Sequence, residues 1–319
     1  MCMKYRVANG GEMKQKIGLL VMAYGTPETE ADLMPYYTSI RRGYAPTEAE
    51  VAVLKSRYEA IGGLSPLAAI TKGQAELLAK QLNETSETVE YELFIGHKHM
   101  APFIEDAVSA MGEAGLTEAV AIVMAPYFSM FATASYFERA KRRAARYGLS
   151  IGEVTAWNEE PEFLVYWSKA LAQTLAKVKA QHVAVIFTAH SLPYHVIHMG
   201  DTYPQMVEAT AQRIAEQVGL TKYEMAWQSA GVRGDWLTPD VMEVTRKVAQ
   251  EADAIVYVPI GFVCDHLEIL YDNDIACKAL CDELNVSYWR VSMPNTDETF
   301  VKAMAQAVRH LPIKDEVKE

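Results

Sequence analysis

Apolar runs of strand length alternate with amphipathic helical stretches along the whole chain of 319 residues. Several of the runs, such as 119–125, are continuously apolar, which is typical of parallel strands covered on both faces. The alternation predicts two doubly wound α/β domains of the Rossmann-like kind, each with a four-stranded parallel sheet flanked by helices. The expected strands are 17–23, 89–95, 119–125, 149–155, 182–188, 223–228, 254–259 and 286–291.

The same pattern predicts the domain organisation. A helix over 160–179 is the natural bridge between a first domain over 16–175 and a second over 176–319. The last helix, 298–311, is expected to pack back on the first domain. Residues 1–15 are polar and lack the apolar stretch of a signal peptide, so we expect a non-structural extension, with Met13 as an alternative start. The other expected helices are 66–82, 102–114, 135–147, 205–218, 239–249 and 265–283.

Composition excludes several classes of protein. With 30 basic and 41 acidic residues the formal net charge is −11, which argues against non-specific nucleic-acid binding. No apolar run reaches the roughly 18 residues that span a membrane. The four cysteines form no CxxC pair, so free thiols in a reducing cytoplasm are expected rather than an iron–sulfur cluster. A monomer is the default expectation.

Two positions are singled out by the rule that ligands of open parallel sheets bind beyond the carboxyl ends of the strands. Tyr24 follows the first strand of the first half, and His190 follows the first strand of the second half. In a two-domain protein these corners would face one cleft, where an active site is expected. A histidine there can accept a proton or bind a metal, although a hydrogen bond at a strand end is an equally simple role.

An acidic segment follows the strand over 254–259. Asp265, Glu268 and Asp272 are spaced i, i+3 and i+7, so they would share one face of a helix. A solvated acidic face and a cation-binding face both fit this spacing. His190 and Glu268 together would offer a base and a mixed nitrogen and oxygen ligand set for a divalent transition metal. No Walker loop or GxGxxG follows the first strand, so ATP and dinucleotide chemistry lack their usual phosphate site.

A basic cluster stands out in this acidic chain, with tyrosines interleaved. Such a mixture suits a flat aromatic ligand that carries carboxylates, although a solvated helix surface is an alternative. The basic residues of this cluster are Arg41, Arg42, Lys55 and Arg57.

Five motifs, in this order along the chain, resemble those of the ferrochelatases. They are GLLVMAYGTP, RYEAIGGLSPL, VIFTAHSLP, WQSAGVRGDWLTPD and PIGFVCDHLEILYDND. The resemblance covers about residues 16 to 311, and the YGTP, YY..IRRG and RYEAIGG forms are most like the soluble Gram-positive enzymes that act on coproporphyrin III. It implies insertion of Fe²⁺ into coproporphyrin III to give coprohaem, in haem biosynthesis.

The resemblance also implies roles for individual residues. His190 and Glu268 match the iron-binding and catalytic pair, Tyr24 the axial ligand of the product iron, and Asp272 an outer metal site. Ala276 replaces a glutamate common in relatives, and Ala230 replaces a charged residue. The positions matching contacts to the macrocycle and its propionates are Arg41, Arg57, Tyr58, Ser65 and Tyr136.

Fe²⁺ enters this interpretation as a substrate, with no tightly bound cofactor, and the porphyrin is the other partner. Transient contact with the preceding and following enzymes of the haem pathway is compatible with it. Three alternatives stay open: a protoporphyrin IX ferrochelatase, a nickel or cobalt chelatase for another tetrapyrrole, and a haem carrier that binds without turnover.

Overall fold

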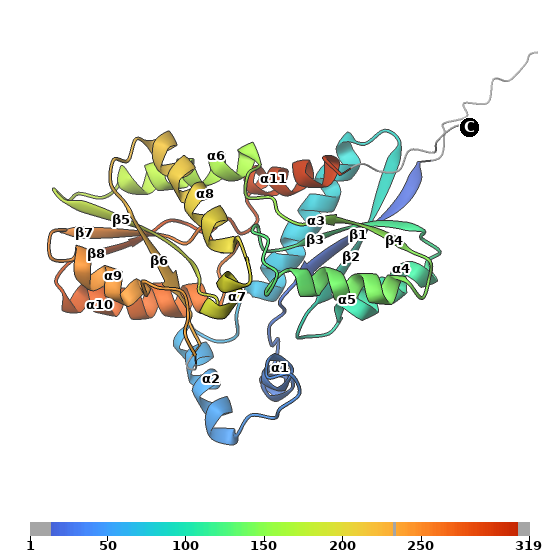
Figure 1. The fold of residues 1–319 in the computed structure, drawn as a ribbon, viewed down its shortest axis with the longest axis horizontal. Helices are drawn as coiled ribbons and strands as arrows, with labels where there is room; N and C mark the ends of the chain where they lie inside the picture. The colour runs from blue at the N-terminus through green and yellow to red at the C-terminus, as the bar shows by residue number, and fades with distance from the viewer. Residues whose placement is uncertain (1–13, 232–233, 312–319) are drawn as a thin grey trace, which may run out of the picture.

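The computed structural model describes residues 14–231 and 234–311, which form two four-stranded parallel sheets side by side (Figure 1). The strand orders β2-β1-β3-β4 and β6-β5-β7-β8 repeat one topology in the two halves, which confirms the predicted α/β fold. The strands are β1 Gln15–Ala23, β2 Val89–His97, β3 Glu118–Val123, β4 Ser150–Val154, β5 Val183–His190, β6 Glu224–Gln228, β7 Ala254–Val258 and β8 Ser287–Arg290.

Helices cover both faces of the sheets. Because β1 is central and covered on both sides, its last seven residues are all buried, which explains its continuous apolar run. The helices of the first half are α1 Leu33–Ile40, α2 Glu48–Ala60, α3 Leu67–Thr85, α4 Ile104–Glu113, α5 Ala134–Ala144 and α6 Pro161–Leu175. Those of the second half are α7 Tyr194–His198, α8 Tyr203–Val218, α9 Val241–Val248, α10 Lys278–Glu283 and α11 Glu298–Arg309, with a π-helix, η2, over Ile269–Cys277.

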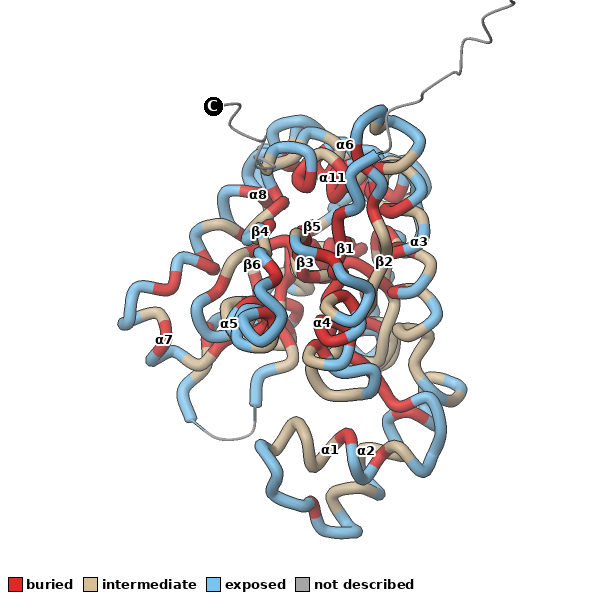
Figure 2. The backbone as a smooth tube through the Cα atoms, turned by 90° about the vertical axis from the view of Figure 1, so that its right-hand side faces the viewer, coloured by how far each residue is buried: buried red, intermediate tan, exposed pale blue. Residues whose placement is uncertain are grey.

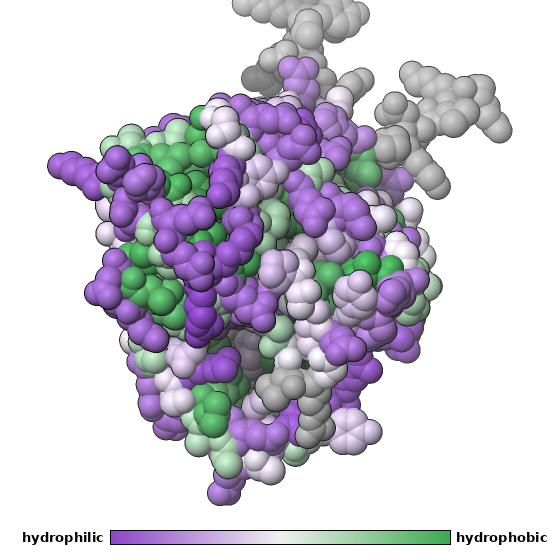
Figure 3. Space-filling view, turned by 60° about the vertical axis from the view of Figure 1, so that its left-hand side comes forward, coloured by the Kyte–Doolittle hydropathy of each residue, from purple (hydrophilic) through white to green (hydrophobic). Residues whose placement is uncertain are grey.

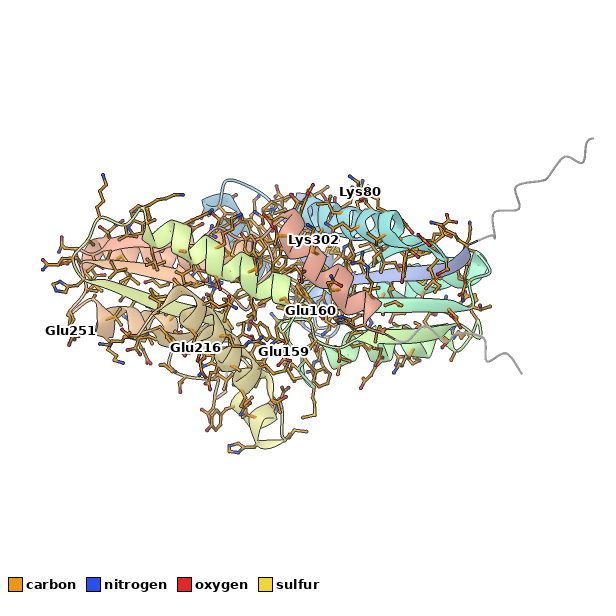
Figure 4. All side chains as sticks on the ribbon, turned by 90° about the horizontal axis from the view of Figure 1, so that it is seen from above. Lys80, Glu159, Glu160, Glu216, Glu251 and Lys302 are labelled. Atoms are coloured by element: carbon orange, nitrogen blue, oxygen red, sulfur yellow. The ribbon has the colours of Figure 1, made fainter. Side chains whose placement is uncertain are left out.

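The last helix joins the two halves. Seen from above, α11 lies beside α6 (Figure 4), and it packs on both α6 and α3. Phe300 of α11 contacts Trp157 and Phe163 with ring centroids 5.4 Å apart in each case. One continuous core therefore holds residues of both sheets, among them Val21 and Phe187. The division into domains over 16–175 and 176–319 stays a prediction.

Helices α1 and α2 were not predicted from the sequence. Figure 2 shows them as a lobe projecting below the two sheets. Only Leu33 and Tyr36 of α1 and Tyr58 of α2 are buried, so neither helix has the apolar stripe by which a helix is recognised in a sequence. The short helix α7 was also missed.

The structure corrects two boundaries. The helix expected over 265–283 begins only at Leu267 and continues as the π-helix η2, so Asp265 lies before it. The Asp265 carboxylate turns instead to Arg290 Nη2 at 3.0 Å and Asn295 Nδ2 at 2.7 Å. The expectation that Asp265 shares an acidic helix face with Glu268 was therefore wrong. Residues 1–13 of the expected extension lie outside the described residues, but Gln15 is already part of β1.

The surface in Figure 3 is mostly hydrophilic, and the described cysteines are free thiols. Hydrophilic residues cover most of the face in Figure 3. Among the described residues, we find no helix that combines the length and the apolar character needed to cross a bilayer. Cys264, Cys277 and Cys281 are buried free thiols, and Cys2 lies outside the described residues. Burial raises the pKa of each of the three thiols, so they stay protonated and unreactive.

Candidate active site

The segments leaving the carboxyl ends of both sheets surround a cavity of about 630 Å³. This volume is within the usual range for a small-molecule site. Its walls come from the ends of β1, β2, β3 and β5, the loop after β7, the start of α5, and the lobe of α1 and α2. The cleft predicted between the corners at Tyr24 and His190 is thus present.

His190 is the last residue of β5, and its ring orientation is set by the backbone. Its Nδ1 lies 2.5 Å from the carbonyl oxygen of Ser191. Because a carbonyl can only accept, Nδ1 carries a proton, and Nε2 is left to face the cavity. The hydroxyl of Tyr203 donates to the carbonyl of His190 at 3.1 Å and anchors this end of the strand.

Glu268 reaches His190 from the neighbouring strand's loop. Its Oε1 lies 3.6 Å from Nε2 of His190. This approach depends on Gly261, where a Cβ would come within 2.5 Å of the Ala189 Cβ. A side chain at Gly261 would push the loop after β7 away from β5, and with it Glu268.

A third side chain, His266, completes the group. Its Nε2 lies 3.7 Å from Oε2 of Glu268, while its Nδ1 donates to the carbonyl of Cys264 at 2.9 Å. One carboxylate is therefore flanked by two imidazoles, each held by a backbone carbonyl. Sequence reasoning missed His266, although it stands two residues before Glu268 in the same motif.

The electrostatics of His190 and Glu268 are coupled. Burial lowers the pKa of His190, but the charge and hydrogen bond of Glu268 outweigh it and raise the pKa above that of a free imidazole. Burial raises the pKa of Glu268, but His190 and His266 outweigh it in turn and hold the pKa of Glu268 well below its usual range. At neutral pH the protein without ligand therefore holds an imidazolium–carboxylate pair.

Asp272 lies one turn of η2 beyond Glu268, and both residues line a smaller cavity of about 220 Å³. The hydroxyl of Ser229 donates to Asp272. Burial, together with the charge of Glu268, raises the pKa of Asp272.

Arg57 lines the same small cavity with its guanidinium 5.1 Å from the centre of the Tyr271 ring. Because Glu268 and Tyr24 line both cavities, the two spaces meet at the carboxylate of Glu268.

Four of the residues singled out for ligand contact line the larger cavity: Tyr24, Tyr58, Ser65 and Tyr136. Tyr24 packs against His99 with ring centroids 4.5 Å apart. Burial and the charge of Glu268 raise the pKa of the Tyr24 phenol, so the hydroxyl is protonated in the protein without ligand.

The basic cluster around Arg41 and Lys55 is less available to a ligand than the sequence indicates. Arg41 pairs with Glu50 at 2.6 Å, and Lys55 pairs with Glu30. Arg41 is among the lining residues of neither cavity described above. Arg42 does line the larger cavity, as does Lys98, which sequence reasoning missed. Lys98 directly follows β2, so the strand-end rule that identified His190 could have found it.

This arrangement can bind a flat, largely apolar ligand and exchange protons with it at the His190–Glu268 pair. Glu268 is the only acid among the described residues that line the larger cavity. The described residues contain no group of three or more His, Cys, Asp or Glu side chains that could hold a metal ion.

The chain matches known proteins over most of its length. A family model described as ferrochelatase matches residues 16–311. The coproporphyrin III ferrochelatase of Anoxybacillus flavithermus is 51% identical over 92% of this chain and 96% of its own length. The coproporphyrin III ferrochelatase of Staphylococcus aureus is 45% identical over 94% of this chain and 100% of its own.

Solved structures show the same fold at low identity. The cobalt complex of the sirohydrochlorin chelatase from Bacillus subtilis subspecies spizizenii has a TM-score of 0.57 and 14% identity, and covers 93% of this chain and 94% of that one. The family match and the relatives at about 50% identity identify the family, which the fold alone would not. The chain is a metal chelatase that belongs to the ferrochelatase family.

Proposed function

We propose that this protein inserts Fe²⁺ into coproporphyrin III and releases two protons. The observation that carries the proposal is the His190–Glu268 pair in a cavity between the carboxyl ends of two parallel sheets. The relatives named coproporphyrin III ferrochelatase support this choice of substrate.

Iron insertion replaces two pyrrole N–H protons with one metal ion, so the site must take up protons as the metal enters. Nε2 of His190 and the carboxylate of Glu268 face each other at 3.6 Å and can both accept a proton or bind the metal. The resting pair already holds one proton, so His190 must release it before it can accept another. Either residue could act as the base while the other guides the metal.

The ring must also be bent, because a planar macrocycle presents its nitrogens poorly to an ion above its plane. Binding energy from groups at the edge of the ring can be used for this distortion. The rigid walls formed by buried side chains such as Tyr36, Tyr127 and Leu192 supply the shape against which the ring is held.

We assign the remaining site residues as proposals carried over from the family. Tyr24 would ligate the product iron, and Asp272 would hold a metal ion on its way to Glu268. Arg57 lines the small cavity beside Asp272, whereas Arg41 would have to leave Glu50 to reach a substrate. The proposed contacts to the macrocycle and its propionates are Arg41, Arg57, Tyr58, Ser65 and Tyr136.

The proposal also covers the cofactor requirement, the compartment, the oligomeric state and the partners of the protein. Fe²⁺ is a substrate, and no tightly bound cofactor is required by the chemistry. The enzyme works in the cytoplasm, where buried free thiols stay reduced. It acts as a monomer, and it passes its product on through transient contact with other enzymes of the haem pathway.

An anaerobic assay tests the function. Purified protein is mixed with Fe²⁺ and either coproporphyrin III or protoporphyrin IX, and loss of the free-base absorption spectrum is followed. We expect faster conversion of coproporphyrin III at equal solubilisation. Preference for protoporphyrin IX would contradict the substrate, conversion with only Ni²⁺ or Co²⁺ would contradict the metal, and binding without conversion would indicate a carrier.

A further inference from the structure

The lysine and the arginine among the described residues that line the larger cavity lie near each other, since the charge of Arg42 acts on Lys98, and we call the part of the cavity that they line its cationic end. Lys98 and Arg42 line this end, and among the described residues neither has a carboxylate within ion-pair distance. The neighbouring cations differ, because Arg41 pairs with Glu50 and Arg139 pairs with Glu105 at 2.6 Å. The described residues that line this end, none of them acidic, are Ser39, Arg42, Lys98, His99, Ser135 and Tyr136.

Lys98 is held in a defined position. Its backbone N–H donates to the carbonyl of Ala23 at 2.9 Å, which fixes it beside the end of β1. Its ammonium donates to Ser135 Oγ at 2.8 Å and to the carbonyl of Ala132 at 3.4 Å. It also lies 4.7 Å from the centre of the Tyr136 ring. An ammonium has three donors, so one remains for a ligand.

This ammonium is placed where a positive charge is costly without an anion. Burial, followed by the charges of Arg139 and Arg42, lowers the pKa of Lys98 to about 8. Burial and the charges of Lys98 and Arg139 lower the pKa of His99 to about 4, so that imidazole is neutral. A carboxylate that entered this end would accept a charge-assisted hydrogen bond and offset the repulsion between the cations.

We propose that Lys98, together with Arg42, binds one carboxylate of the porphyrin and selects a substrate with four carboxylates over one with two. The inference rests on the proposed function and adds the group that recognises one of the additional carboxylates. Lys98 belongs to the first sheet and the His190–Glu268 pair to the second, and both line one cavity. A flat ligand can therefore present its centre to the pair and one edge to Lys98.

Substitution of Lys98 tests this proposal. Lys98→Met keeps the length of the side chain but removes its charge. A charge-assisted hydrogen bond in a partly buried site contributes enough to change affinity roughly ten- to hundredfold. We expect KM for coproporphyrin III to rise by about this factor, whereas KM for mesoporphyrin IX, with two propionates, changes by less than about threefold. Lys98→Arg should recover most of the loss, because it restores the positive charge.

A binding measurement separates this inference from the function itself. Quenching of tryptophan fluorescence by metal-free coproporphyrin III reports affinity without turnover, and it should weaken by the same factor in Lys98→Met. The matched control is Lys80→Met, because Lys80 on α3 is exposed at the outer edge of the molecule (Figure 4). Wild-type protein that does not insert iron would overturn the function, not the contact.

Two results would overturn the proposed contact while leaving the function intact. In the first, Lys98→Met weakens binding of both porphyrins equally, which is what a structural role through Ser135 and Tyr136 would produce. In the second, coproporphyrin III binds Lys98→Met as tightly as it binds wild type.

Discussion

Replacing Glu268 by glutamine should change the protonation of His190 in a direction that the structure fixes. Glu268→Gln keeps the size of the side chain but removes the charge that lies 3.6 Å from Nε2. The remaining influence of the surroundings is burial, which lowers the pKa of an imidazole. The midpoint of the His190 titration should therefore fall.

The size of this fall follows from the distance. Two unit charges 3.6 Å apart interact by about 4–5 kcal/mol at an effective dielectric constant of about 20, and by about 1 kcal/mol in bulk water. The two side chains expose 36% and 39% of their surface to the open cavity, so solvent screening places the value between these limits. Since 1.36 kcal/mol corresponds to about one pH unit, the midpoint should move down by about one to three pH units.

Nuclear magnetic resonance can measure this midpoint. Protein labelled at the Cε1 carbon of histidine is titrated, and the His190 signal is identified by its absence from His190→Ala. Glu251→Gln is the control, because Glu251 is exposed at the far edge of the second half (Figure 4) and should leave the signal unmoved. A midpoint that stays in place or rises in Glu268→Gln would refute the coupling of the two groups.

Stability gives a second measure of the same substitution. The raised pKa of His190 stabilises the fold below the ordinary imidazole pKa of about 6.5, and this contribution is lost as pH rises through the raised value. The lowered pKa of Glu268 stabilises the fold above the ordinary carboxyl pKa of about 4.3, and this contribution is lost as pH falls through the lowered value. Urea unfolding should therefore show the largest destabilisation by Glu268→Gln between about pH 4.3 and 6.5.

Three other substitutions test the site. His190→Ala should lower the rate of iron insertion by about 10²–10⁴-fold with an unchanged circular dichroism spectrum, and more than about a tenth of wild-type activity would contradict a base or ligand role. Gly261→Ala should destabilise the protein by about 1–3 kcal/mol in urea unfolding and reduce insertion, because its Cβ would lie 2.5 Å from that of Ala189. Gly152→Ala is its control, since the nearest atom lies 3.6 Å away. Tyr24→Phe should alter the absorption spectrum of the bound iron product more than the insertion rate, and an unchanged spectrum would exclude the phenol as a ligand.

The parts of the fold that could be predicted are those with a regular pattern of apolar residues in the sequence. Buried parallel strands are continuously apolar, and all eight were found within a few residues of their observed ends. The strand-end rule then placed His190 and the loop of Glu268 at the same edge of one sheet, where the structure brings them to 3.6 Å. Helices α1 and α2 could not be found this way, because almost nothing in them is buried.

Local departures from a regular α-helix also could not be predicted from the sequence pattern. The spacing of Asp265, Glu268 and Asp272 was interpreted with the α-helical period, but Asp265 lies before the helix, and Asp272 lies on η2, a π-helix with hydrogen bonds between residues five apart. The side-chain amide of Gln228 donates to Asn273 of η2 at 3.1 Å, and Ser229 donates to Asp272. These contacts come from β6 and its end, so no property of the η2 segment alone reveals them.

A cluster of basic residues in a sequence does not by itself supply cations that are free to bind a ligand. Arg41 and Lys55 stand in a basic cluster, but Arg41 forms an ion pair with Glu50 and Lys55 forms one with Glu30 at the surface. Lys98 has no such partner among the described residues, because the segment after β2 enters a wall of tyrosine, serine and backbone carbonyls. The charge of Lys98 therefore lies in a partly desolvated place. A carboxylate bound there contributes more to the binding free energy than an exposed ion pair, which typically contributes about 0–1 kcal/mol. If Arg41→Ala impairs coproporphyrin III use more than Lys98→Met does, the ion pairs of the lobe open on binding and this reasoning fails.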